Sequence, residues 1–274
     1  MSGTREPDVS SRQNPHFKAA LALRDAKERR ARGHIIVDGA REIERALLGG
    51  IRPVEAWVAS ERVRGAPAQA LLPRLASAAQ VIETTPELLA RLAYGDRDEG
   101  IVAVFEMPST DLGRLAPTLP ADALVAVMER VEKPGNLGAL LRSADGAGVD
   151  AVIAADPVSD IWNPNAIRAS LGTIFSTPVA VCSSAEALAF LRANDFAVVA
   201  ARVEGATDYD RVDMTGAVAL VVGAENSGLT PTWSGAGVTS AAIPMLGLAD
   251  SLNVSASAAV LFYEARRQRR AIDR

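Results

Sequence analysis

The chain has 274 residues, of which 49% are hydrophobic and 23% are charged, and its formal net charge is −4 at neutral pH. These values are typical of a globular protein, and the length allows one large domain or two ordinary ones. So small a net charge gives no overall attraction to nucleic acid. Binding of nucleic acid would therefore require local basic patches.

Cysteine and histidine are too scarce for a disulfide framework or a zinc centre. The one cysteine, Cys182, cannot form an intrachain disulfide and indicates a reducing compartment. His16 and His34 have no partners at metal-ligand spacing, so we expect no metal. No apolar run approaches the roughly 20 residues that span a bilayer, and the polar N-terminus lacks a signal-peptide core. We therefore expect a cytoplasmic protein without a membrane segment.

Basic residues gather in two runs, one in each terminal region. The first run contains Arg12, Lys18, Arg24, Lys27, Arg29, Arg30 and Arg32, and the second contains Arg266, Arg267, Arg269, Arg270 and Arg274. Either run could be a solvated helix face. The prevalence of arginine favours phosphate binding instead, because the guanidinium fork matches phosphate geometry.

The first part of the chain predicts a small α/β domain over residues 15–107, preceded by a polar tail over 1–14 that we expect to be disordered. Helical periodicity covers residues 17–32. The expected strands are then 34–39, 54–60, 80–84 and 101–107, and the expected helices between them are 40–50, 71–79 and 86–93. Residues 108–122 contain three prolines and little periodicity, which indicates an interdomain linker.

The second domain is expected over residues 123–274, where apolar strands alternate with helices. The expected strands are 123–131, 150–155, 177–181, 196–203, 217–225 and 239–245, and the expected helices are 136–148, 163–172, 184–195 and 253–270. Ser184 is the expected N-cap of the helix that it opens. Continuous apolar strands between helices predict an open parallel sheet covered on both faces.

Three strand-to-loop exits of this second domain carry polar residues and glycines. They are ERVEKPGNLGALLR (129–142), LVVGAENSGL (220–229) and IPMLGLADSLNV (243–254). Ligands of open parallel sheets bind beyond the carboxyl ends of the strands, so these exits are candidate site segments. Each could also be a local structure: a turn capped by Asn136, a tight loop at Gly223, or a helix cap at Ser251 or Asn253.

In this order and spacing, the three segments resemble the motifs of the SpoU/TrmH branch of the SPOUT methyltransferases. The matching positions are Asn136 and Arg142 in the first, Gly223, Glu225 and Gly228 in the second, and Ile243, Pro244, Met245, Ser251, Leu252 and Asn253 in the third. Residues 163–179 also resemble a family segment, through Asn163, Pro164, Arg168, Ser170 and Gly172. The domain over 15–107 resembles the ribosomal-protein-like substrate-binding domain of this branch.

The resemblance implies a deep trefoil knot in the second domain, a homodimer, and S-adenosylmethionine as the cofactor. It implies catalytic roles for Arg142, Asn136, Ser251, Asn253 and Glu225. It implies cofactor contacts from Val222, Gly223, Ala224, Glu225, Gly228, Ile243, Met245, Leu252 and Asn253. RNA contacts are expected from Lys27, Arg29, Arg30, Arg32, Arg41 and Arg168.

The implied reaction moves a methyl group from a sulfonium to a ribose 2'-hydroxyl of structured RNA. A guanidinium with a pKa above about 12 is a poor base, so we expect Arg142 to grip a substrate phosphate and orient the hydroxyl, while that phosphate or water accepts the proton. Ribosomal RNA is the favoured substrate, because the transfer-RNA members often lack the first domain, and transfer RNA is the alternative.

Two other functions fit the sequence less well. A family member without activity would bind RNA alone, but the motif residues Asn136, Arg142, Glu225 and Asn253 are present. A nucleotide-dependent oxidoreductase would need the glycine-rich fingerprint GxGxxG and an acidic residue about 20 positions later, and the chain lacks them.

Overall fold

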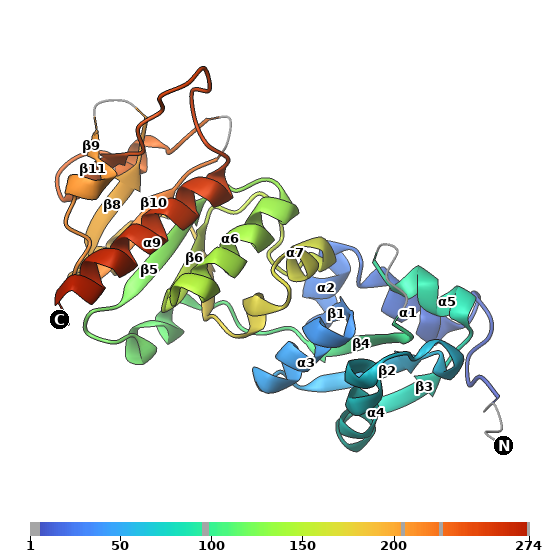
Figure 1. Ribbon diagram of the computed structural model, residues 1–274. Coiled ribbons are helices and arrows are strands. Elements are labelled where there is room, and N and C mark those ends of the chain that lie inside the picture. Colours follow the sequence, from blue (N-terminus) through green and yellow to red (C-terminus); the bar gives the residue numbers. More distant parts are fainter. Residues whose placement is uncertain (1–5, 95–98, 204–205, 225–226, 273–274) are drawn as a thin grey trace. The chain divides into compact units, whose positions relative to one another are not determined.

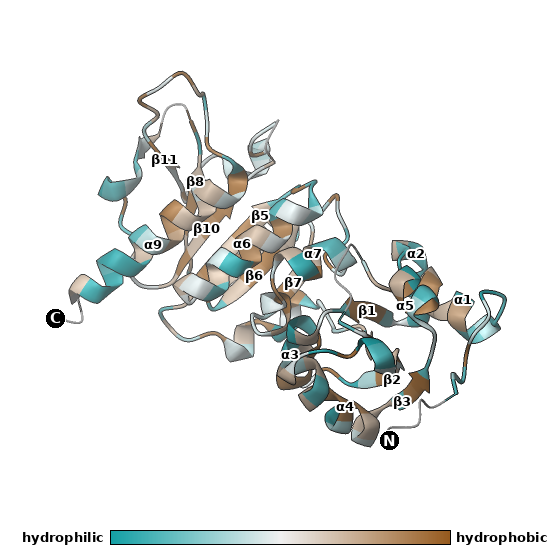
Figure 2. Cartoon of the chain, turned by 45° about the vertical axis from the view of Figure 1, so that its right-hand side comes forward, coloured by the Kyte–Doolittle hydropathy of each residue, from teal (hydrophilic) through white to brown (hydrophobic). Residues whose placement is uncertain are grey.

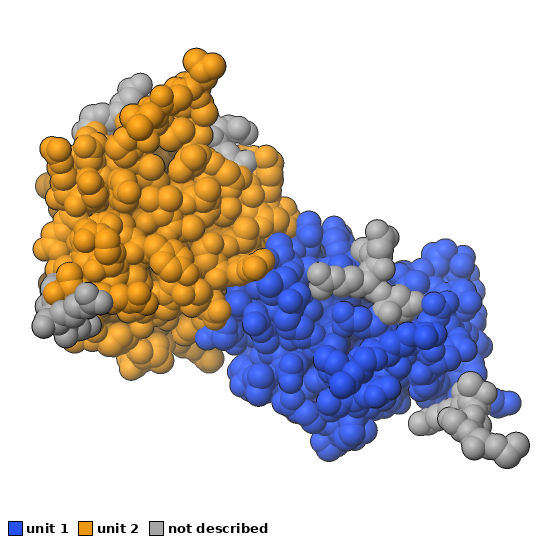
Figure 3. All heavy atoms as spheres, viewed as in Figure 1, with its two compact units in different colours: residues 1–108, 162–176 blue, residues 109–161, 177–274 orange. Residues whose placement is uncertain are grey.

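A computed structural model describes residues 6–94, 99–203, 206–224 and 227–272. The chain forms two compact units, drawn in different colours in Figure 3. Unit 1 contains residues 1–108 and 162–176, and unit 2 contains residues 109–161 and 177–274. Residues 162–176, expected in the second domain, therefore pack with the first. A single boundary at residues 108–122 therefore does not describe the two units, because residues 162–176 return to the first one.

Unit 1 is built on a four-stranded mixed sheet in the order β1-β4-β2-β3. The strands are β1 (His34–Asp38), β2 (Pro53–Val58), β3 (Gln80–Glu83) and β4 (Ile101–Glu106). β4 pairs antiparallel with both β1 and β2, and β2 pairs parallel with β3. Parts of β1 and β3 are brown in Figure 2 because their residues there are apolar, and most residues of β1 and β4 are buried.

The helices of unit 1 pack on this sheet and bury its apolar residues. They are α1 (Pro15–Ala22), α2 (Ala26–Arg32), α3 (Ala40–Leu48), α4 (Ala66–Ala78), α5 (Pro86–Leu92) and α7 (Pro164–Ala169), with short 3-10 turns at Ser60–Arg62 and Thr173–Phe175. α7 contacts β1, and the turn at Thr173–Phe175 contacts α3. Trp162 stacks on Phe175 with ring centroids 6.1 Å apart.

Two expectations for the start of the chain are corrected. The single helix expected over 17–32 is broken between α1 and α2, because the Asp25 side chain accepts the Lys27 N–H and starts a new helix. The tail expected to be disordered is ordered over residues 6–14. Val9 is buried and forms a bridge with Thr84 at the β3 edge, and Asp8 accepts the Glu83 N–H.

Unit 2 is built on a seven-stranded, wholly parallel sheet in the order β7-β6-β5-β10-β8-β11-β9. The strands are β5 (Leu124–Glu129), β6 (Ala151–Ala155), β7 (Val179–Cys182), β8 (Ala197–Ala201), β9 (Thr207–Asp208), β10 (Val218–Val222) and β11 (Val238–Ala242). The short β9 is too brief to be recognised from the sequence pattern.

Helices cover both faces of this sheet. They are α6 (Pro134–Ala147), α8 (Ser184–Ala193) and α9 (Val254–Ile272), with 3-10 turns at Leu112–Arg114, Ala116–Thr118, Tyr209–Arg211 and Pro231–Trp233. α6 and α9 pack side by side on one face, as Figure 1 shows. Ala187 and Leu191 of α8 join a core cluster with alternate strand residues, so α8 covers the other face.

The expected linker is a packed part of unit 2. Leu115 is 4% exposed within the core cluster, and the Thr110 carbonyl accepts the Val181 N–H. The N-cap of α8 is Ser183, which forms a capping box with Glu186, so the expectation for Ser184 is off by one residue. Among the described residues, no helix combines the length and the apolarity needed to cross a membrane.

Candidate functional site

A cavity of about 220 Å³ lies in unit 2, beyond the carboxyl ends of three neighbouring strands. β10, β8 and β11 are adjacent and parallel, so the segments that follow them meet at one edge of the sheet. The residues that line the cavity come from these segments and from the start of α9: Ala201, Arg202, Val203, Val222, Gly223, Ala224, Gly228, Ala241, Ile243, Met245, Asp250, Ser251, Leu252, Val254 and Ser257.

The structure brings most of the expected cofactor residues into this one cavity. Those that line it are Val222, Gly223, Ala224, Gly228, Ile243, Met245 and Leu252, together with Ser251 from the expected catalytic set. Glu225, expected in both sets, lies outside the described residues. Sequence reasoning missed Arg202 and Asp250. Arg202 directly follows β8, so the general position of ligand sites at strand ends could have identified it.

Gly223 is a position where only glycine fits. A Cβ there would lie 2.5 Å from the carbonyl carbon of Gly228 and 2.7 Å from the nitrogen of Leu229, both of them backbone atoms. The loop closes on itself as well, because the Gly228 N–H donates to the Ala224 carbonyl at 2.9 Å. The cavity wall at this side is thus a folded-back stretch of main chain.

Asn136 and Asn253 join two of the motif segments next to the cavity. Asn253 donates from Nδ2 to Oδ1 of Asn136 at 3.3 Å, and its own Oδ1 accepts the N–H and the hydroxyl of Ser255 at the start of α9. Asn253 is therefore both a helix cap and a neighbour of Asn136. The Asn136 Nδ2 atom is buried and has no hydrogen-bond partner among the described residues, which leaves a donor for a ligand.

Arg142 lies on α6, and its side chain is exposed. Within the described part of the chain it makes no hydrogen bond or ion pair, so its charge is not committed to holding the fold. This is a property expected of an arginine that acts on a substrate phosphate.

The expected RNA-binding residues differ in how far they are exposed. Lys27, Arg30, Arg32 and Arg41 have exposed side chains, and of these Arg32 pairs with Glu28 at 3.0 Å and Arg41 with Glu42 at 3.2 Å. Arg29 is 1% exposed and donates to the carbonyls of Leu23 and Arg24, which closes the end of α1. The expected RNA contact from Arg29 is therefore wrong, because its guanidinium serves the helix break.

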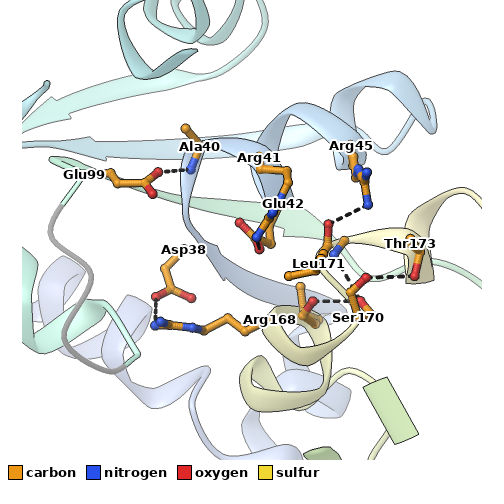
Figure 4. A network of polar contacts seen from close by, with 12 residues as sticks. Asp38, Ala40, Arg41, Glu42, Arg45, Glu99, Arg168, Ser170, Leu171 and Thr173 are labelled. Atoms are coloured by element: carbon orange, nitrogen blue, oxygen red, sulfur yellow. Dashed lines mark hydrogen bonds and ion pairs between the residues drawn. The ribbon is translucent and has the colours of Figure 1, made fainter. Parts of the chain in front are cut away.

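Arg168 is also committed inside unit 1. It donates from Nη1 to Oδ2 of Asp38 at 2.9 Å, and Figure 4 shows the pair within a network that includes Glu42 and Arg45 of α3. Its side chain is 18% exposed and that of Asp38 is 7% exposed. Burial raises the pKa of Asp38 above its usual value, while the Tyr94 N–H and Arg168 act in the opposite direction. Little of the Arg168 charge remains for a phosphate.

The arginines of α9 likewise serve mainly to hold unit 2 together. Arg266 donates to the carbonyls of Ala147 and Gly148 at the end of α6, and Arg267 pairs with Glu264. Arg269 donates to the carbonyls of Met214 and Gly216. Arg274 lies outside the described residues. Two arginines of the C-terminal basic run, Arg266 and Arg269, therefore serve the fold, whereas Arg270 is exposed.

Metal-ligand clusters and the cysteine thiol were the remaining candidates for chemistry. No cluster of three or more His, Cys, Asp or Glu side chains that could hold a metal ion occurs within the described ranges. Cys182 is half-buried, and burial with the nearby carboxylates of Glu186 and Asp156 raises the pKa of its thiol to about 11. A thiol with so high a pKa is a poor nucleophile at neutral pH.

The chain matches two family models, which cover different parts of the sequence. Residues 123–263 match the SpoU rRNA Methylase family, and residues 14–103 match the MRM3-like substrate binding domain.

Individual relatives cover nearly the whole chain. A 23S rRNA (uridine(2479)-2'-O)-methyltransferase of Streptomyces viridochromogenes is 33% identical over 271 residues, which is 95% of this chain and 92% of that protein. The crystal structure of an RNA 2'-O ribose methyltransferase has a TM-score of 0.83 at 37% identity, covering 95% of this chain and 98% of the other. That of the SpoU methyltransferase AviRb from Streptomyces viridochromogenes, in complex with AdoMet, has a TM-score of 0.86 at 30% identity, covering 93% and 98%.

Proposed function

Because the chain belongs to the SpoU rRNA methylase family, we propose that it transfers a methyl group from S-adenosylmethionine to a ribose 2'-hydroxyl of ribosomal RNA. The observation that carries the proposal is the convergence on one cavity of Gly223, which follows β10, with Ile243 and Leu252, which lie between β11 and α9. The related AviRb structure is a complex with AdoMet, and the relative that matches 95% of this chain is named for 23S rRNA.

The residues of the cavity fit an S-adenosyl nucleoside. Apolar side chains of Val222, Ile243, Met245 and Leu252 suit the faces of an adenine ring, and the folded-back main chain at Gly223 lets backbone groups approach its edge. The unpartnered Nδ2 of Asn136 offers a donor to the polar end of the ligand or to the ribose.

S-adenosylmethionine, when bound, supplies a methyl group already activated on sulfonium, so the protein's main task is orientation. Arg142 would grip a phosphate next to the target nucleotide and hold its 2'-hydroxyl in line. Arginine is a poor base because its pKa exceeds about 12, so the phosphate or a water molecule would accept the proton. Asn136, Ser251 and Asn253 would position the ribose and the cofactor, and Glu225 is proposed for the same site.

Unit 1 would bind structured RNA through the exposed Lys27, Arg30, Arg32 and Arg41. These four residues contact phosphates in the proposal, so binding should weaken as the salt concentration rises. We also propose a cytoplasmic location, which is compatible with a ribosomal substrate.

We also propose the trefoil knot and the homodimer of this family. The chain leaves β11 near one edge of the sheet and returns to α9, which packs along α6 and β10 near the middle, and this return supports a threaded connection. Leu246 and Leu248 of the cavity loop are 98% and 104% exposed. Large apolar side chains so exposed on a loop that lines a site support a partner surface there.

The proposal is tested by binding and by mapping. Calorimetric titration with S-adenosylmethionine should give a saturable heat at one site per chain, and no heat would reject the cofactor. Incubation with unmodified ribosomal RNA and with transfer RNA, followed by mass spectrometry of ribose methylation, should give a single modified nucleotide in ribosomal RNA. Modification of transfer RNA alone would favour the alternative substrate.

A further inference from the structure

Glu129 is a fully buried carboxylate close to the candidate site, but it does not line the cavity. It is the last residue of β5, the strand that leads into the first motif segment, and its exposed fraction is 0%. A buried carboxylate is costly unless hydrogen bonds satisfy it. Its position therefore requires a set of donors that the fold holds in place.

Three donors from two other segments supply those bonds. Thr230 donates its N–H to Oε2 at 2.7 Å and its hydroxyl to Oε1 at 2.5 Å, so one residue grips both oxygens. Ser184, at the start of α8, donates its hydroxyl to Oε1 at 2.8 Å. Glu129 thus fastens the loop after β10 and the start of α8 to the end of β5.

Thr230 lies next to the main chain that forms one wall of the cofactor cavity. Gly228, two residues before Thr230, lines the cavity, and the backbone of Gly228 and Leu229 lies against Gly223 with no room for a Cβ. A displacement of Thr230 would move Leu229 and Gly228 and with them the contact surface at Gly223. Three consecutive residues, Thr230, Leu229 and Gly228, therefore connect Glu129 to the cavity.

A second clamp holds the same segment from the other side. Arg202, which lines the cavity, donates from Nη2 to the carbonyl of Trp233 at 3.1 Å and to the hydroxyl of Ser234 at 2.8 Å. The segment from Thr230 to Ser234 is therefore fixed between the ends of β5 and β8, which flank β10 in the sheet.

We propose that Glu129 is a positioning residue that acts through Thr230 to hold Gly228 and Leu229 against Gly223, in the arrangement that binds S-adenosylmethionine. The inference rests on the proposed function of this cavity. It predicts that the Thr230 bonds govern cofactor affinity, whereas the Ser184 bond to the same carboxylate governs stability alone.

The test compares three substitutions, of which two remove one hydroxyl each and the third keeps it. Thr230→Val removes the bond to Oε1 and keeps the size of the side chain, and Thr230→Ser keeps the hydroxyl. Ser184→Ala removes the other hydroxyl bond to the same oxygen without touching the loop. Each variant is titrated with S-adenosylmethionine by calorimetry, and its thermal unfolding is followed without ligand.

Thr230→Val should weaken cofactor binding about tenfold, the effect of losing one hydrogen bond to a charged group. Thr230→Ser should restore binding to within about twofold, and Ser184→Ala should lower the unfolding temperature while its dissociation constant stays within about twofold of the unchanged protein. If Thr230→Val does not fold, Glu129→Gln replaces it, because the amide keeps the shape of the side chain but its nitrogen cannot accept a hydrogen bond, so the three bonds cannot all remain. The expected loss of affinity is in the same direction.

Two results would overturn the inference while the proposed function stands: unchanged affinity in a folded Thr230→Val, or an equal loss of affinity in Ser184→Ala. The second would mean that the carboxylate supports unit 2 in general. If the unchanged protein itself shows no binding of S-adenosylmethionine, the proposed function fails first and the inference fails with it.

Discussion

Arg168 donates a hydrogen bond to the Asp38 carboxylate at 2.9 Å, although the two residues are 130 positions apart in the sequence. The bond ties α7, which lies between two strands of unit 2 in the chain, to the end of β1 in unit 1. Both side chains are largely buried. The pair therefore helps to hold residues 162–176 in unit 1, a placement that no local sequence pattern predicts.

Arg168→Ala should destabilise unit 1 by about 3 kcal/mol, because removing one partner of a buried pair leaves the other charge unpaired. Chemical denaturation followed by tryptophan fluorescence measures the free energy of unfolding, and Trp57 and Trp162 both report on this unit. Arg52→Ala is the matched control, since the Arg52–Glu106 pair is 71% and 47% exposed. Such a surface pair should contribute no more than about 1 kcal/mol. Equal effects of the two substitutions would contradict the structural role of Arg168.

Asp38 should also give unit 1 a measurable pH dependence. Its pKa is raised above 3.8 in the folded protein, mainly by burial, so the folded state holds this proton more tightly than the unfolded state does. Its contribution to the free energy of unfolding should therefore decrease as the pH rises from about 4 through the raised pKa, and stay constant above it. The difference between the unchanged protein and Asp38→Asn, measured by urea denaturation over a pH series, isolates this contribution.

Asp213 provides a control of opposite sign. Hydrogen bonds from the hydroxyl and the N–H of Thr215 lower the pKa of Asp213. Its contribution should be lost as the pH falls through the lowered pKa, so the difference between the unchanged protein and Asp213→Asn should grow with pH. The same slope for both aspartates would show that Asp38 is not held in the way that the structure indicates.

The sequence predicts the helices and strands of this fold better than it predicts the unit to which each belongs. Apolar strands such as β5 and β6 and capped helices such as α8 are specified locally, within a residue or two. The assignment of residues 162–176 to unit 1 depends on Arg168, Asp38 and the Trp162–Phe175 stack, which are contacts at long range. The cavity was foreseen through a family resemblance. Composition and periodicity alone would have left its three loops as separate turns.

Arg29 and Thr230 show the same limit for single residues. A basic residue in an arginine-rich helix is usually at the surface, and only the break at Asp25 turns Arg29 inward. Thr230 has no local feature that distinguishes it from any loop threonine. Its pairing with Glu129 spans 101 positions and appears only once β5 and β10 are neighbours.

A fragment of residues 109–274 should behave poorly in solution, in spite of its apparent completeness as a domain. It would carry the segment 162–176 without the rest of unit 1, exposing Trp162, Ile167 and Phe175, which are at most 7% exposed in the whole chain. Size-exclusion chromatography and binding of a hydrophobic dye should show aggregation that the full chain lacks. A monodisperse fragment without dye binding would mean that the segment finds another site, and RNA binding by such a fragment could then be compared directly with the full chain.

Arg142→Ala should lower the rate of methyl transfer by about 10²-fold or more, the scale of losing a group that orients the reacting hydroxyl. Its affinity for S-adenosylmethionine should stay within about twofold, because Arg142 does not line the cofactor cavity. Arg142→Lys keeps the charge and loses the fork of donors, so it should recover only part of the rate. Single-turnover methylation of ribosomal RNA and calorimetry measure the two quantities. A near-normal rate in the alanine variant would remove Arg142 from the mechanism.

Gly223→Ala should impair cofactor binding at least tenfold, because the added Cβ would lie 2.5 to 2.7 Å from backbone atoms of Gly228 and Leu229 that cannot rotate away. The strain would be relieved by moving the same wall that Glu129 holds through Thr230. Gly135→Ala is the matched control. Gly135 is the second residue of α6 and a Cβ there meets nothing within 4 Å, so alanine should leave the stability unchanged or raise it by less than about 1 kcal/mol. Calorimetric titration of both variants with S-adenosylmethionine, beside their thermal unfolding, separates a distorted cavity from a general loss of stability. Binding by Gly223→Ala as tight as by Gly135→Ala would show that the close contact at Gly223 does not shape the site.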